Sequence, residues 1–172
     1  AIPFHQKAVK LNSDNEDAWL NYALSLITLV RYSEAQKCIE KALDLNQNSA
    51  NGWYLFGNIN FHMGEPSKAL ECYQRALMLN PNYVEAWNNA GRVFNEIKTY
   101  PESVACFERA LSLNPNFLEA LNNLGNAKLR ERKFGEAKLL FDKAIAVDGL
   151  SADSWNNLSH LSIEEGANEI AV

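Results

Sequence analysis

The stretch "WYLFGNINFHMGEPSKALECYQRALMLNP" at residues 53–81 decides how the rest of the chain is interpreted. It begins with a tryptophan, has a glycine four residues later at Gly57, and ends with Pro81 after a Leu-Asn pair. We predict two helices around it, a first over residues 50–63 and a second over residues 67–80.

The tryptophan returns with a period of 34 residues. The positions equivalent to it are Trp19, Trp53, Trp87, Leu121 and Trp155. An alanine column has the same period, at Ala8, Ala42, Ala76, Ala110 and Ala144. A fixed period of this length is the signature of an array of repeated supersecondary units. Counting the tryptophan as position 4, the repeats are 16–49, 50–83, 84–117, 118–151 and a partial 152–172, and residues 1–15 hold the second helix of a preceding repeat and a linker.

The period carries a motif of the form W-x2-[L/F]-G, then A-x3-[F/Y], then Pro. In the repeat 50–83 its residues are Trp53, Phe56, Gly57, Ala69, Tyr73, Ala76 and Pro81. The sequence therefore resembles the tetratricopeptide repeat (TPR) family over essentially its whole length. The resemblance implies an all-α, right-handed superhelical solenoid of antiparallel helix pairs, forming a single domain over residues 1–172. One helix pair cannot bury its apolar face alone, so stacked neighbours share a core.

Charge and cysteine usage narrow the class of partner and the compartment. The net charge is −5 and the pI about 5.2, which argues against a nucleic-acid partner, since that would need a basic face. No apolar run approaches the ~18 residues of a membrane span, and no signal peptide is visible. Cys38, Cys72 and Cys106 share one apolar column, so we expect packed, unpaired thiols. These fit a reducing compartment, and we expect a cytoplasmic protein.

No constellation in the sequence points to catalysis. We find no nucleophile with a base and no pair of carboxylates placed for acid–base work. The histidines share no metal-ligand spacing; they are His5, His62 and His160. We therefore expect no enzyme activity, no metal and no cofactor. The basic run "KLRERK" at 128–133 fits a solvated turn better than a phosphate site.

In the TPR family the first helix of each repeat lines the concave face, where ligands lie. Position 6 of that helix is mostly asparagine: Asn21, Leu55, Asn89, Asn123 and Asn157. An asparagine amide offers two donors and an acceptor, which suits the backbone of an extended peptide. The column is similar to the asparagine ladder in the TPR superhelix of O-linked N-acetylglucosamine transferases. The alternative is that an asparagine-rich chain simply exposes polar residues to water.

The lining changes along the chain. It is apolar in the first two repeats, around Tyr54, Leu55 and Phe61, and is rich in hydrogen-bonding groups beyond them. We predict an apolar pocket followed by a hydrogen-bonding floor. The predicted peptide-binding residues are Asn21, Asn58, Asn88, Asn89, Arg92, Asn122, Asn123, Asn126, Arg130, Asn156, Asn157, Tyr54, Leu55 and Phe61.

Two features bear on the type of ligand. Chaperone-binding TPR domains hold a C-terminal carboxylate with a lysine at position 5, and this chain has no lysine there, which argues against Hsp70 or Hsp90 tails. Position 2 is mainly acidic. The acids could steer a basic ligand into the groove, or simply favour the start of each helix.

The sequence thus predicts a non-catalytic protein–protein interaction module that binds an extended peptide or partner segment in its concave groove. Two alternatives remain open at this point. One is a structural unit that forms homo-oligomers through uncapped repeat ends. The other is the substrate-selecting arm of a larger enzyme such as a glycosyltransferase.

Overall fold

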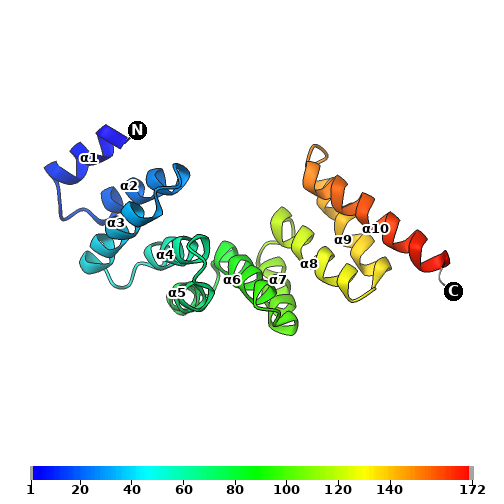
Figure 1. Cartoon of the computed structure of the whole chain (residues 1–172). Helices are drawn as coiled ribbons and strands as arrows, with labels where there is room; N and C mark the ends of the chain where they lie inside the picture. Colours follow the sequence, from blue (N-terminus) through cyan, green and yellow to red (C-terminus); the bar gives the residue numbers. More distant parts are fainter. Residues whose placement is uncertain (1, 171–172) are drawn as a thin grey trace. The chain divides into compact units, whose positions relative to one another are not determined.

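The computed structural model describes residues 2–170, with side chains as far as residue 166. Within this range the chain forms ten helices and no β-strand (Figure 1). In chain order they are α1 (Ile2–Leu11), α2 (Glu16–Thr28), α3 (Tyr32–Leu45), α4 (Ala50–His62), α5 (Pro66–Leu79), α6 (Val84–Glu96), α7 (Tyr100–Leu113), α8 (Leu118–Arg130), α9 (Phe134–Val147) and α10 (Ala152–Ile170). The predicted class is confirmed: the chain is an all-α helical repeat solenoid.

The helices follow the predicted period closely, except at the last one. In the repeat 50–83 the two helices begin at Ala50 and Pro66, within one residue of the prediction. The sequence predicted that the first helix of the last repeat would end near residue 165. Instead, α10 continues through Gly166 to Ile170. In the other repeats a residue with a positive φ at position 15 ends the first helix.

The chain divides into two compact units, residues 1–93 and 94–172, and each is described by itself. In the first unit α2 packs on α3 and α4 on α5, and α2 also contacts α4. In the second unit α8 packs on α9, while α10 contacts both α8 and α9. First helices of successive repeats therefore contact one another within each unit, which brings their polar faces together. That all repeats form one domain remains a prediction.

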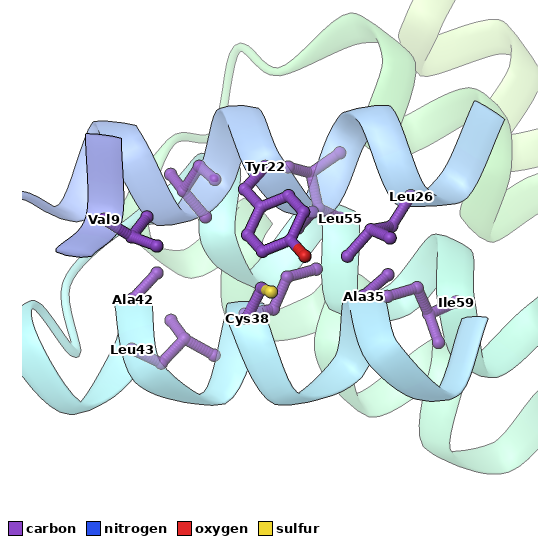
Figure 2. Close-up of a cluster of buried hydrophobic side chains, with 12 residues drawn as sticks. Val9, Tyr22, Leu26, Ala35, Cys38, Ala42, Leu43, Leu55 and Ile59 are labelled. Carbon is purple, nitrogen blue, oxygen red and sulfur yellow. The ribbon is translucent and has the colours of Figure 1, made fainter. Parts of the chain in front are cut away.

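The core of the first unit lies between the two layers of helices. Tyr22 and Leu26 of α2 point toward Ala35 and Cys38 of α3, and Ile59 of α4 joins the same cluster (Figure 2). Leu26, Ala35 and Ile59 are completely buried. A fully buried leucine or isoleucine stabilises a fold by roughly 1.5–3 kcal/mol. Packing against neighbouring helices, more than intrinsic propensity, therefore holds each short helix.

Glycine at position 8 lets the two helices of a repeat approach closely. A Cβ at Gly57 would lie 2.5 Å from Cε1 of Tyr73, and one at Gly125 would lie 2.3 Å from Cε1 of Phe141. Both rings are almost completely buried. The glycine of the first helix thus receives the aromatic ring of the second.

The turn between the two helices of a repeat has the same form each time. The residue at position 15 has a positive φ, and these residues are Val30, Gly64, Lys98 and Arg132. The following N–H then reaches back five residues in a Schellman motif, as in Arg31 N–H to the Leu26 carbonyl at 2.9 Å. The turn satisfies the last carbonyls of the first helix before the chain reverses.

The tryptophan at position 4 secures the start of the first helix. Its indole Nε1 donates to a backbone carbonyl six residues earlier, in the loop that precedes the helix. The four bonds are Trp19 to Ser13 (2.8 Å), Trp53 to Gln47 (2.9 Å), Trp87 to Pro81 (2.9 Å) and Trp155 to Gly149 (3.0 Å). Each loop is therefore fixed to the helix that follows it.

Candidate functional site

Four polar side chains form a network on the first unit. Asn89 of α6 donates through Nδ2 to Oδ1 of Asn58 at 2.9 Å and to the hydroxyl of Tyr54 at 3.3 Å, both on α4. The hydroxyl of Tyr73 on α5 donates to the same Asn58 oxygen at 2.8 Å. Three helices thus contribute to one set of hydrogen bonds at the surface formed by α4 and α6.

Aromatic rings border this network. Tyr54 lies between Tyr73, with ring centroids 6.2 Å apart, and Tyr83, at 4.8 Å. The Tyr83 hydroxyl donates to Oδ1 of Asn51 at 3.2 Å. Burial raises the pKa of Tyr73 and Tyr83 above the ordinary value for tyrosine, so both hydroxyls stay neutral donors at physiological pH.

Arg92 lies on the same face of α6 as Asn89, one turn later. Its guanidinium carbon lies 5.1 Å from the centroid of the Phe61 ring, a cation–π arrangement. Its Nη1 donates to Oδ1 of Asn89 at 3.5 Å, which is a long hydrogen bond. The side chain itself is exposed. Among the described residues no carboxylate forms an ion pair with it.

The second unit repeats the same register of hydrogen bonding. Asn157 of α10 donates to Oδ1 of Asn122 on α8 at 3.2 Å, and Asn122 donates to Oγ of the fully buried Ser154 at 2.9 Å. In both units the asparagine at position 6 bonds the residue at position 5 of the preceding repeat. The two pairs are Asn89 with Tyr54 and Asn157 with Asn122.

An arginine of the second unit, Arg130, lines a small pocket. Nη1 of Arg130 donates to Oδ1 of Asn95 at 2.6 Å, and its guanidinium carbon lies 4.5 Å from the centroid of the Tyr100 ring. The pocket has a volume of about 180 Å³. It is lined by Asn95, Tyr100, Ser103, Val104, Ala127, Arg130 and Glu131.

The structure brings some predicted residues together and places others elsewhere. Tyr54, Asn58, Phe61, Asn89 and Arg92 form one surface in the first unit. Leu55 is 6% exposed and packs in the core, so it offers little surface to a ligand. The remaining predicted residues are Asn21 and Asn156, which are exposed, Asn123 and Asn126, which are half-buried, and Asn88, which is buried.

Sequence reasoning missed the contribution of the second helices. Tyr73 belongs to the buried column at position 24, whose other members are Ile39, Phe107 and Phe141. Among these residues Tyr73 alone carries a hydroxyl, and it faces the gap left by Gly57. This one hydroxyl in an otherwise apolar column was the sequence feature that could have indicated a role for the second helix. Ser154, Asn95 and Tyr100 were also missed.

The basic run at 128–133 is paired within the protein. Lys128 lies 3.4 Å from Glu136 and 3.8 Å from Glu108, and Lys133 lies 2.7 Å from Glu131. Both lysines of the run therefore have acidic neighbours.

The cysteines are free and buried, as predicted. Burial raises the pKa of each thiol to about 11, so they are unreactive at neutral pH; they are Cys38, Cys72 and Cys106. Within the described part of the chain, no group of three or more His, Cys, Asp or Glu is placed to hold a metal ion. No helix in that part is long and apolar enough to cross a membrane.

Family models for the tetratricopeptide repeat match four segments of the chain: residues 1–59, 50–83, 91–131 and 118–149. An uncharacterised protein of Methanocaldococcus jannaschii is 47% identical over 38 residues, which is 22% of this chain and 44% of that protein. The match therefore spans less than half the length of this relative.

Solved structures share the fold over most of the chain. MamA is 25% identical, with a TM-score of 0.75 over 88% of both chains. YrrB, a TPR protein with an unusual peptide-binding site, is 22% identical, with a TM-score of 0.73 over 94% of this chain and 84% of its own. PilF of Pseudomonas aeruginosa is 24% identical, with a TM-score of 0.81 over 88% and 69%.

Proposed function

The chain belongs to the tetratricopeptide repeat family and is a protein-interaction module, and from that premise we propose that it binds an extended peptide segment of a protein partner. The segment lies along the surface formed by α4 and α6. The likeness to YrrB concerns the fold alone, so the proposal rests on the residues of this chain.

The observation that carries the proposal is the repeated bond from position 6 to position 5 of the preceding repeat. Within each unit it places an amide group between successive first helices, at Asn89 in the first unit and at Asn157 in the second. A peptide backbone presents donors and acceptors at regular intervals, and such a row can bind it without reading its side chains. We propose that this row acts as the predicted ladder in modified form, with amides that also bond one another.

Internal pairing limits what the amides contribute to affinity. Asn89 already donates two hydrogen bonds and accepts others from Asn88 and Arg92. A bound peptide would exchange some of these bonds for new ones. A hydrogen bond contributes only about 0.5–1.5 kcal/mol net even when water is the competitor, so such an exchange is close to neutral. The long bonds of 3.3–3.5 Å are the ones most easily exchanged.

Aromatic surface beside the network supplies the missing affinity. Tyr54 and Phe61 are half-buried, so part of each ring remains open at the surface. Aromatic rings provide large contact area with few rotatable bonds to immobilise, which suits them to binding. The proposal therefore assigns orientation of the peptide to the amides and most of the binding free energy to the rings.

The test uses linear twelve-residue peptides selected from a random library on the immobilised protein. The tightest peptide is titrated into protein labelled with ¹⁵N. We expect chemical shifts to change at the side-chain amide signals of Asn58 and Asn89 and at the backbone of α4 and α6. Exposed residues of α5, such as Glu71 and Gln74, serve as internal controls, and their signals should not shift. Shifts confined to α3, α5, α7 and α9 would place binding on the other face and reject the proposal.

A further inference from the structure

We infer that the bound peptide carries a carboxylate, and that Arg92 binds it above the ring of Phe61. The inference rests on the proposed function and names the ligand chemistry of the same surface. It starts from an arginine that is exposed, held in place and without an acidic partner among the described residues.

Arg92 differs from the cations of this chain that form ion pairs. Arg31 forms two bonds of 2.7 Å with Glu34, and Lys128 lies between two glutamates. Arg92 has an aromatic ring and an amide oxygen as neighbours instead. An arginine carries five N–H donors and is always charged in proteins, so most of its hydrogen-bonding capacity remains for water or a ligand.

The side chain is oriented before any ligand arrives. The ring of Phe61 supports one side of the guanidinium, and Oδ1 of Asn89 fixes one of its donors. Asn89 is itself held by Asn58 at 2.9 Å. Ordering a long side chain on binding costs conformational entropy, and part of that cost is already met in the folded protein.

The geometry of the donor selects the ligand. A guanidinium is planar and presents a fork of donors that matches the two oxygens of a carboxylate. Sites for phosphorylated peptides gather several arginines, whereas here one guanidinium lies over one ring. The net charge of −5 opposes an acidic ligand at long range, so we expect the contact to set specificity more than association rate.

The carboxylate has two possible sources, an aspartate or glutamate side chain and the C-terminus of the peptide. Both are tested with oriented peptide pools of nine residues. In three pools the central residue is Glu, Gln or Lys, the other positions are random without acids, and both termini are blocked. In two further pools all positions are random without acids, and the C-terminus is either free or amidated.

Binding of each pool is measured by fluorescence anisotropy on the native protein and on Arg92→Gln. The variant Arg92→Lys keeps the positive charge but loses the paired N–H donors of the guanidinium. Arg75→Gln is the matched control, since Arg75 is an exposed arginine on α5. Circular dichroism and melting temperature verify that all variants are folded.

We expect the Glu pool or the free C-terminus pool to bind about tenfold more tightly than its neutral counterpart, as a charge-assisted hydrogen bond predicts. The preference should vanish in Arg92→Gln, weaken in Arg92→Lys and persist in Arg75→Gln. If all pools bind equally, or the preference survives in Arg92→Gln, the inference is wrong while the proposed function stands. If no pool binds, both are wrong.

Discussion

At the scale of the residue, the turn inside each full repeat holds one residue in the left-handed region. Position 15 is left-handed in four repeats, and only one of them has a glycine there, Gly64 with φ 75°. In the first repeat the same position is Val30 with φ 60°. A left-handed residue other than glycine costs roughly 1–2 kcal/mol, and a β-branched side chain is among the least suited. Packing of the two helices must overcome this cost.

We therefore predict that Val30→Gly stabilises the protein by about 0.5–1 kcal/mol, after allowing for the larger entropy of glycine in the unfolded chain. The side chain lost is 67% exposed, so little packing disappears with it. The reciprocal change Gly64→Val, at the same position of the next repeat, should destabilise the protein by a comparable amount. Urea unfolding of both variants measures this. A loss of stability in Val30→Gly would contradict the argument.

At the scale of the element, the fit of one helix against the next depends on small residues at the crossing. Gly125 of α8 faces Phe141 of α9 with no room for a methyl group. We predict that Gly125→Ala destabilises the protein by about 1–3 kcal/mol, because the buried ring must shift. Gly135→Ala is the control, since a Cβ there meets nothing within 4 Å and the residue lies in a helix. It should be neutral or stabilise by about 0.5 kcal/mol. Thermal unfolding of the two variants distinguishes a steric effect from a general effect of removing glycine.

Helices α8 and α10 are joined by a buried amide. Asn122 is 9% exposed and bonds both Ser154 and Asn157. We predict that Asn122→Ala costs about 1–2 kcal/mol, since the buried Ser154 hydroxyl loses a donor. The neighbouring exposed Asn156 gives the control, and Asn156→Ala should change the free energy of unfolding by less than about 0.5 kcal/mol. If denaturant titrations give the same change in the free energy of unfolding for both variants, the hydrogen bonds of the Asn122 side-chain amide do not contribute to stability.

The placement of helices could be predicted from sequence because it depends on local signals. A period of 34 residues with tryptophan, glycine and alanine columns places every helix within about one residue, apart from the end of α10. The residues of the site were harder to predict from the sequence, because the site depends on contacts between repeats. Position 6 was expected to face a ligand, yet Asn89 and Asn157 bond the preceding repeat, and the buried Tyr73 joins the network from a second helix. Such cross-repeat bonds follow from the geometry of stacking, which the column pattern does not contain.

At the scale of the whole molecule, the cysteine column links stability to pH. Burial raises the pKa of all three thiols to about 11, from an unperturbed 9.0. Because the folded-state pKa lies above the unfolded one, the folded state holds these protons more tightly. The stabilisation is fully present below about pH 9 and is lost as the pH rises toward 11.

We predict that the urea midpoint under reducing conditions falls between pH 9 and pH 11. Replacement of all three cysteines by alanine should make this fall smaller, whatever its effect at pH 7. Lysines and tyrosines that titrate in the same range act on both proteins and cancel in the comparison. An identical pH dependence of the two proteins would show that the thiols are not responsible.

The tryptophans that fix the interhelical loops also make the chain its own optical reporter. Indoles in four repeats share one hydrogen-bonded setting, while the repeat 118–151 has Leu121 in that place. Emission spectra therefore contain no indole from α8 or α9, whereas the far-ultraviolet dichroism signal includes these helices. If that repeat melts on its own, the two optical curves separate, and if the array melts together they superimpose. One missing indole thus turns an ordinary pair of spectroscopic measurements into a test of cooperativity along the array.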